Sequence, residues 1–144
     1  MSENYIPSPS DWVREQVEKI DATGDTRAVS VMDRPVVMLT MRGRKTGAIR
    51  KVPLMRVEHD GTYAAVASKG GAPEHPVWYG NLQADPTITL QDGTESWTAV
   101  AREIEGQERE QWWDRCVAAY PPYAEYQTKT DRLIPVLLLE RAED

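Results

Sequence analysis

The sequence of 144 residues contains no phenylalanine, one cysteine and two histidines. The single cysteine, Cys116, excludes an internal disulfide and a metal site built from several cysteines. His59 and His75 do not form the H-x-x-x-H or H-E-x-x-H spacing that is typical of zinc sites. We therefore expect no bound metal, and we interpret Cys116, which lies in a helical pattern, as a buried core residue and not a nucleophile.

Long apolar runs and an excess of positive charge are also lacking. The run 136–139 is much too short to cross a bilayer, and the first residues have neither the basic nor the apolar part of a signal peptide. With 17 Lys+Arg against 23 Asp+Glu, the net charge is −6. This charge argues against a nucleic-acid partner, because phosphate neutralisation supplies most of that affinity. We expect a cytoplasmic protein.

From residue 35 onward, the pattern predicts a mainly antiparallel sheet. Apolar and β-branched runs separated by turn residues indicate about six strands, at 35–41, 48–58, 62–68, 87–91, 94–103 and 134–140. Two Asp-Gly pairs between these runs are signals for hairpins. Helices are predicted at 76–84 and 106–120. The fold class is therefore mainly β (α+β), as an antiparallel barrel or sandwich with helices at its ends.

An amphipathic helix is predicted before the sheet, with Ser8 as its cap, Pro9 at its first position and Gly24 at its end. Its apolar stripe consists of Val13, Val17 and Ile20. A membrane-surface anchor, peripheral at the inner face of the membrane, is one interpretation. A helix packed on its own domain is favoured, because the polar face is not strongly basic. We divide the chain into an N-terminal helical extension, residues 1–30, and one domain, residues 31–144.

Positive charge gathers in one loop between two predicted strands. The segment 41–51, MRGRKTGAIRK, holds five basic residues and no acidic one. Its glycines let the backbone approach a ligand. Arg44, Lys45 and Arg50 are placed to surround an anion, and each charge-assisted hydrogen bond contributes about 1.5–3 kcal/mol. The alternative is a solvated hairpin whose charges keep a sheet edge from pairing, and the loop alone does not decide between the two.

Three other segments combine glycines, hydroxyl groups and aromatic rings. Residues 67–71, ASKGG, are typical either of a backbone that approaches an anionic or planar ligand or of an ordinary turn. Trp78 either walls a ring or fills the core. Tyr120, Tyr123 and Tyr126 recur at three-residue spacing, as a lid over the core or as phenols that contact a ring. Taken with the basic loop, these segments predict a planar, ring-bearing, polyanionic cofactor.

The order of these segments resembles the deazaflavin-dependent nitroreductase family of actinobacteria. The similarity runs from about residue 35 to residue 140 and includes LTMRGRKTG (39–47), VPL (52–54), ASKGG (67–71), PVWYGNL (76–82), ADP (84–86), AYPPYAEYQ (119–127), TDR (130–132) and IPV (134–136). The resemblance implies a split β-barrel like that of FMN-binding flavoproteins. It also implies reduced coenzyme F420 as the cofactor, a 5-deazaflavin with a phosphodiester and an oligoglutamate tail.

The resemblance further implies roles for individual residues. The cofactor phosphate and tail would be held by Arg44, Lys45, Thr46, Gly47 and Arg50. The ring and headgroup would lie against Val66, Ser68, Lys69, Gly70, Val77 and Trp78. The substrate side would be closed by Met55, Tyr120, Tyr123 and Tyr126, with Ser68, Tyr123 or Tyr126 orienting a proton. Met55 departs from the family, whose members often carry an aromatic residue at this position.

The implied reaction is hydride transfer to a small, electron-poor ring that acts as the electron acceptor. Candidates are a quinone, a nitroaromatic or nitroimidazole, and an α,β-unsaturated lactone such as a coumarin or aflatoxin. The protein would contribute mainly by holding two rings in contact. Three alternatives stay open: an FMN-dependent reductase or oxidase, a non-catalytic carrier of F420, and a binding domain with a charged hairpin. A hydrolase is not expected, since no Ser-His-Asp grouping is recognisable.

Overall fold

The computed structural model describes residues 5–142. Two expectations fall partly outside the described residues. These are the outer ends of the two expected ranges, 1–30 and 31–144, and the start of the chain, on which the signal-peptide expectation depends. The helices are α1 (Asp11–Thr23), α2 (Val77–Ala84), α3 (Gly106–Ala119) and α4 (Pro122–Thr128), with 3-10 turns η1 (Thr26–Ala28) and η2 (Lys69–Gly71). The strands are β1 (Ser30–Val31), β2 (Arg34–Arg42), β3 (Ile49–Met55), β4 (Glu58–His59), β5 (Thr62–Val66), β6 (Thr87–Asp92), β7 (Glu95–Glu103) and β8 (Val136–Arg141).

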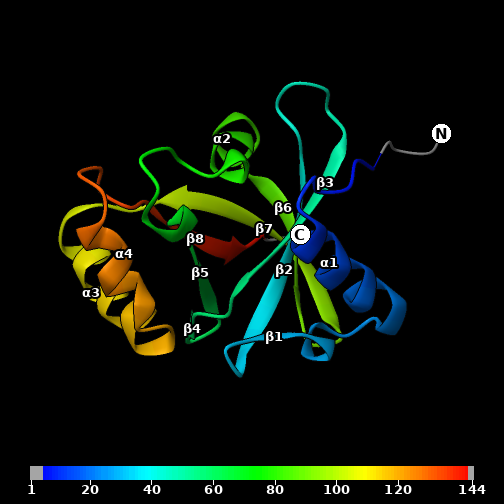
Figure 1. Ribbon diagram of the computed structural model, residues 1–144, viewed down its shortest axis with the longest axis horizontal. Helices are drawn as coiled ribbons and strands as arrows, with labels where there is room; N and C mark the ends of the chain where they lie inside the picture. The colour runs from blue at the N-terminus through cyan, green and yellow to red at the C-terminus, as the bar shows by residue number, and fades with distance from the viewer. Residues whose placement is uncertain (1–4, 143–144) are drawn as a thin grey trace.

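The strands form one antiparallel sheet in the order β1-β2-β6-β7-β8-β5-β4, and β3 pairs with β2 away from this path. Strand β2 has three partners, because its residues 34–35 pair with β1, residues 36–42 with β3 and residues 38–40 also with β6, so the sheet branches at β2. The sheet curls into a half-barrel with helices around it (Figure 1). The prediction of a mainly antiparallel sheet of about six substantial strands is confirmed, and the curled sheet decides against a sandwich.

The core consists of apolar clusters on both faces of the sheet. In β2, Val37 and Leu39 face the cluster inside the half-barrel, whereas Val36 and Met38 face α1. In β8 the same alternation sends Leu137 and Leu139 inward, while Val136 and Leu138 pack with α3 and α4. Because successive strand side chains point to opposite faces, a strand buried on both sides reads as a continuous apolar run. This burial explains the unbroken runs at 36–39 and 136–139.

Helix α1 begins two residues later than the sequence predicted. The Ser10 hydroxyl caps it by accepting a hydrogen bond from the Val13 N–H, at 3.4 Å. Ser8 is not the cap, because its hydroxyl accepts instead from the Ser10 N–H outside the helix. Gly24 ends the helix at φ +70°, as expected.

The apolar stripe of α1 packs on the sheet. Val17 and Ile20 are buried against Val36 and Met38 of β2. This packing agrees with the favoured interpretation of the helix. Among residues 5–142, no helix has the length and apolar character needed to cross a membrane.

Other local predictions differ from the structure mainly in their boundaries. The strand predicted at 48–58 is divided into β3 and β4, and the strand predicted at 62–68 ends at Val66, where the chain turns into η2. Pro53 lies in β3, whose described partner is β2, so its missing N–H breaks no ladder on the other side. Cys116 is 0 % exposed, and burial raises the pKa of its thiol to about 12, which confirms it as a core residue.

Candidate functional site

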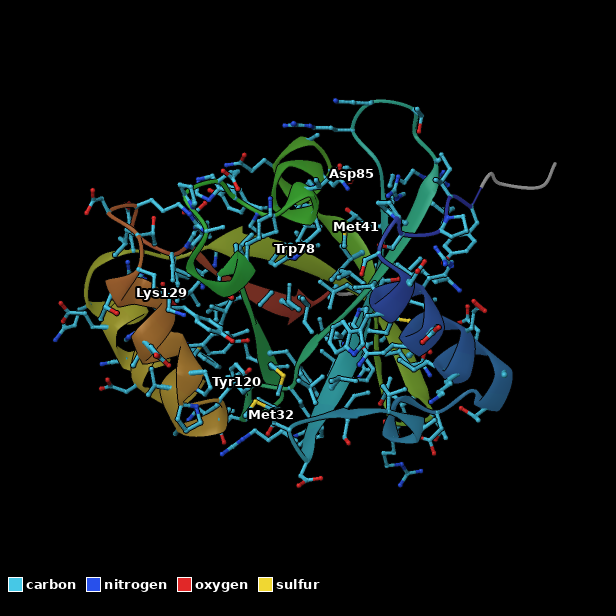
Figure 2. The ribbon with its side chains drawn as sticks, viewed as in Figure 1. Met32, Met41, Trp78, Asp85, Tyr120 and Lys129 are labelled. Carbon is cyan, nitrogen blue, oxygen red and sulfur yellow. The ribbon has the colours of Figure 1, made fainter. Side chains whose placement is uncertain are left out.

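A cavity of about 600 Å³ lies between α1, β3, α2, η2 and α4. This volume is within the range of small-molecule sites. Most of the surface that faces it is apolar, from residues such as Val36, Met41, Val52 and Leu54. Figure 2 shows Trp78 below α2, toward the middle of the molecule. Tyr120 lies beside Met32 in the lower part of the view. A mostly apolar cavity of this size is typical of sites that bind organic ligands.

The sequence-predicted site residues gather around this cavity. Those that line it are Arg50, Met55, Val66, Ser68, Lys69, Gly70, Val77, Trp78, Tyr120, Tyr123 and Tyr126. Those that do not line it are the loop-tip residues Arg44, Lys45, Thr46 and Gly47, which are exposed between β2 and β3. The loop-tip residues are therefore placed to contact a part of a ligand that extends out of the cavity.

The loop between β2 and β3 has a defined shape and is joined to α2. The Gly43 N–H donates to Ala48 O and the Gly47 N–H donates to Gly43 O, each at 2.8 Å, with Gly47 at φ +72°. The Arg44 N–H donates to the Asn81 side-chain oxygen, at 3.0 Å. Figure 1 shows the loop rising beside α2. These hydrogen bonds fix the backbone positions from which the charged side chains of the loop extend.

The Arg44 side chain lies directly over Gly80 of α2. An ideal Cβ built on Gly80 would be 2.6 Å from Arg44 Nη1, so any larger residue at this position would push the guanidinium away. Glycine normally weakens the interior of a helix. Its presence in α2 is explained by the room that it gives to Arg44.

The cations near the cavity differ in whether a carboxylate neutralises them. Lys51 pairs with Asp21 at 2.9 Å, and Lys69 lies 3.5 Å from Glu74. Arg44, Lys45 and Arg50 form no ion pair with any residue in the range 5–142. In a chain with a net charge of −6, three cations without a carboxylate partner are an attractive site for an anion.

The turn at η2 brings backbone to the cavity. Lys69, Gly70 and Gly71 all have positive φ, at +47°, +64° and +84°. An ideal Cβ on Gly70 would meet nothing within 4 Å, whereas one on Gly71 would be 2.7 Å from Tyr126 O. Gly70 therefore leaves open space beside the cavity, and Gly71 lets the turn pack tightly on α4.

Arg132 holds this turn in place and was given no role by the sequence analysis. Its guanidinium donates to the carbonyl oxygens of Ala67, Ser68 and Ala72, at 3.1, 2.8 and 3.0 Å. The Gln127 side chain in turn donates to Arg132 O, at 2.8 Å. The triplet TDR at 130–132 was part of the family resemblance, but nothing in its letters indicated which distant carbonyls the arginine binds.

The three tyrosines form one cluster at the α4 side of the cavity. The hydroxyl oxygens of Tyr120 and Tyr126 are 3.2 Å apart, and the rings of Tyr120 and Tyr123 meet edge to face at 4.9 Å. The hydrogen bond to Tyr120, with burial, raises the pKa of Tyr126 to about 12. Burial raises the pKa of Tyr123 as well. Tyr123 and Tyr126 are therefore neutral hydrogen-bond donors at physiological pH.

Trp78 combines the two roles that the sequence left open. It is half-buried, packs against the cluster inside the half-barrel, and also lines the cavity. Val77, which precedes it, is 70 % exposed at the rim. Val66 is buried and Met55 half-buried on the opposite strands. The residues predicted to contact a ring thus supply walls of one and the same cavity.

Helix α1 supplies a wall that the sequence analysis did not include. Trp12, Val13 and Gln16 of this helix line the cavity, together with Asn81 of α2. No motif marked them, because an amphipathic helix shows which residues are buried but not against what. Among residues 5–142, no group of at least three His, Cys, Asp or Glu side chains is placed to hold a metal ion.

The fold itself defines a class of proteins. HutZ, the heme storage protein from Vibrio cholerae, has the same fold at a TM-score of 0.55, with 16% sequence identity over 78% of this chain and 84% of that chain. At this identity the likeness shows the fold alone. The curled half-barrel is a split β-barrel of the type found in flavin- and heme-binding proteins, as the resemblance implied.

Sequence comparisons identify the family within this class. Residues 12–141 match the family model described as F420H2-dependent quinone reductase. A putative F420H2-dependent quinone reductase from Mycobacterium tuberculosis is 34% identical over 105 residues, which covers 73% of this chain and 88% of the relative. A solved F420-H2 dependent reductase, FDR-A, is 61% identical with a TM-score of 0.71, over 78% of this chain and 99% of that chain. This chain belongs to the F420H2-dependent quinone reductase family. It is an oxidoreductase, and its cofactor is coenzyme F420.

The residues around the cavity fit this cofactor. Apolar walls on β3 and α2 suit a deazaflavin ring, and the open space at Gly70 lets the ring approach the backbone. The cations Arg44, Lys45 and Arg50, which pair with no carboxylate in the range 5–142, suit a phosphodiester and carboxylates beyond the mouth. FMN carries no such tail, so it would leave part of the loop unused.

Proposed function

We propose that the protein transfers a hydride from reduced F420 to a quinone bound beside it in the cavity. One observation carries this proposal: an apolar cavity of about 600 Å³ has neutral phenols at its α4 side and, at its mouth, cations that pair with no described carboxylate. The quinone reductase names of the family and of its relatives support a quinone as the acceptor. Nitroimidazoles and unsaturated lactones are related acceptors of the same electron-poor, ring-bearing kind.

Reduced F420, when bound, supplies the hydride. The chain would hold it through Arg44, Lys45 and Arg50 at the tail, with Thr46 and Gly47 adding polar and backbone contacts. Val66, Val77, Trp78 and the turn 68–70 would hold the ring and headgroup. The apolar walls of the cavity would shield the bound ring from water. Positioning of this kind replaces a bimolecular encounter by a fixed contact of two rings.

The chain's own contribution to proton chemistry lies at the tyrosine cluster. A quinone oxygen becomes basic when the ring is reduced, and it then requires a hydrogen-bond donor. Tyr126, whose hydroxyl is 3.2 Å from that of Tyr120, is a neutral phenol that lines the cavity. Tyr123 shares this wall, and Ser68 lies at η2. We assign Tyr126 as the principal donor, because its hydroxyl has a second phenol with which to share a proton.

The pH profile should show no tyrosine ionisation in the neutral and mildly alkaline range. The pKa of Tyr126 is raised to about 12, so its neutral donor form persists as pH rises and is lost only near pH 12. We expect kcat/KM for the acceptor to stay level between pH 7 and about pH 10. Steady-state rates across that range measure it. An alkaline decline centred near pH 10 that disappears in Tyr126→Phe would show that this phenol has the ordinary pKa of a tyrosine, and it would contradict the raised pKa.

The choice of acceptor can be tested directly with the purified protein and F420H2. Oxidation is followed by the return of F420 fluorescence, with menadione, a nitroimidazole and coumarin as acceptors. We expect the highest kcat/KM with menadione. A higher value for either of the other two would overturn the quinone proposal. Binding of F420 without turnover of any acceptor would indicate a non-catalytic carrier of F420. Preferential binding of FMN in a parallel titration would indicate an FMN-dependent enzyme.

A further inference from the structure

His75 lies between η2 and α2 and contacts Arg132 directly. The imidazole nitrogen Nδ1 of His75 is 3.2 Å from Nη1 of Arg132. A guanidinium can only donate hydrogen bonds, so the imidazole accepts this bond at Nδ1 and carries its proton at Nε2. An imidazolium has a proton on both nitrogens and cannot accept. The contact therefore requires the neutral form of His75.

This contact completes the set of acceptors that surrounds the Arg132 guanidinium. The other three are carbonyl oxygens on both sides of η2, those of Ala67, Ser68 and Ala72. The bond to His75 comes from the same Nη1 atom that donates to Ala67 O. A planar guanidinium bound at several points can neither rotate nor shift without breaking bonds. His75 thus helps to fix the turn whose residues 68–70 line the cavity.

The imidazole of His75 is open to solvent on one side and packs on a neutral ring on the other. The residue is exposed, and its ring centroid is 4.5 Å from that of Tyr79 in α2. Burial and a hydrogen bond to Glu103 raise the pKa of Tyr79 to about 12, so this phenol stays neutral where histidines titrate. Histidine is the side chain that ordinarily changes charge between about pH 5 and 8. A proton from solvent can therefore reach His75 within that range.

No carboxylate in the range 5–142 forms an ion pair with His75. Glu74, which precedes it, is paired with Lys69 at 3.5 Å. Asp131, which precedes Arg132, is exposed and forms no ion pair with a described residue. Protonation of His75 would therefore remove a hydrogen bond and leave two cations at a contact of 3.2 Å.

We propose that His75 is a positioning residue for F420: it holds Arg132, and through it η2, only while its imidazole is neutral. This inference rests on the proposed function, in which residues 68–70 hold the ring and headgroup of the cofactor. Above the titration range of histidine the contact is complete, and the turn has its binding shape. Below that range the imidazolium repels Arg132, the turn loosens, and the affinity for F420 falls.

Titrations with F420 at about pH 7.5 and about pH 5.5 test this dependence in three proteins. His75→Phe keeps a ring on Tyr79 but offers Arg132 no acceptor, whereas His75→Asn keeps a side-chain oxygen that accepts and does not titrate. Between the two pH values we expect the wild type to lose about two- to tenfold more affinity than either variant, the effect of one ordinary hydrogen bond. At the higher pH, His75→Phe should bind more weakly than the wild type, and His75→Asn should match it. Titration of the cofactor itself affects all three proteins alike.

His59→Asn is the matched control, because His59 is the other histidine of the chain and lies in β4 beside Asp60. This variant should keep the pH dependence of the wild type. Loss of the dependence in His59→Asn would assign it to the wrong histidine, and an equal dependence in the wild type and His75→Phe would remove it from His75. Either result would overturn the proposal.

Hydrogen exchange without F420 separates this inference from the proposed function. The Gly71 N–H donates to Ser68 O at 2.9 Å, so its exchange rate reports how often the turn opens. At a single pH near 7.5, this amide should exchange about two- to tenfold faster in His75→Phe than in the wild type, and at the wild-type rate in His75→Asn. Equal exchange in all three proteins would refute the role of His75 and leave hydride transfer to be judged by F420H2 oxidation. Faster exchange with unchanged F420 affinity would overturn the contact of this turn with the cofactor.

Discussion

Replacing Arg44 and Lys45 together by alanine should weaken F420 binding by about 10²–10⁴-fold without lowering the stability of the fold. Each charge-assisted hydrogen bond contributes about 1.5–3 kcal/mol, and about 1.4 kcal/mol corresponds to a factor of ten in affinity. Both side chains are exposed and form no ion pair with described residues, so folding does not depend on them. Fluorescence titration gives the Kd, and chemical denaturation gives the free energy of unfolding.

Arg27→Ala/Arg141→Ala is the charge control for the binding titration, because it removes the same charge at η1 and at the end of β8; it also removes the ion pair of Arg27 with Asp25 and the contact of Arg141 with Trp97. If both double variants weaken binding alike, the loop acts only through net charge, and the specific clamp is wrong. Gly80→Ala adds a geometric control: its Cβ would be 2.6 Å from Arg44 Nη1. That change should weaken binding in the wild-type background and have no further effect in Arg44→Ala. A full effect in both backgrounds would mean that Gly80 acts independently of Arg44.

The second large effect is expected at the adjacent glycines Gly70 and Gly71. Alanine at Gly71 should mainly lower the stability of the fold, and alanine at Gly70 should mainly weaken F420 binding. In Gly71→Ala the new Cβ would be 2.7 Å from Tyr126 O and 2.9 Å from Lys129 Cβ, at φ +84°. Backbone strain and overpacking together should lower the free energy of unfolding by about 2–5 kcal/mol. In Gly70→Ala, at φ +64°, no atom lies within 4 Å. The strain alone should then cost about 1–2 kcal/mol.

Gly70→Ala, the more stable of the two variants, should nevertheless show a clear loss of F420 affinity. The Cβ in Gly70→Ala enters open space beside the cavity, where a ring would otherwise contact the backbone. We expect Gly70→Ala to remain folded and to bind F420 at least tenfold more weakly. Denaturation curves and F420 titrations of both proteins measure the contrast. Wild-type affinity in Gly70→Ala would show that the ring does not approach this turn. Equal stability of the two variants would show that α4 shifts to make room for the new Cβ in Gly71→Ala.

Much of the fold followed from local pattern. Apolar runs, Asp-Gly turns and proline positions predicted the main strands and helices, because side-chain periodicity and turn chemistry act over a few residues. The φ values of +52° and +84° at Asp60 and Gly61 are those that an Asp-Gly hairpin turn requires. The start of α1 was predicted wrongly for the same local reason: Ser8 and Ser10 are both good caps, and the sequence does not state which hydroxyl turns toward the helix.

The sequence alone determined which chemical groups this protein has available: a basic loop with glycines, a glycine turn after a strand, and three tyrosines beside prolines. The roles given to these residues stay predictions, although the structure brings them around one cavity. Only the tertiary structure decided which distant groups meet. Gly80 makes room for Arg44, Arg132 binds carbonyls on both sides of η2, and α1 brings Gln16 into the wall of the cavity that the tyrosines also line. Such contacts depend on how the sheet curls and where helices pack on it, and long-range packing leaves no periodic signal in the chain.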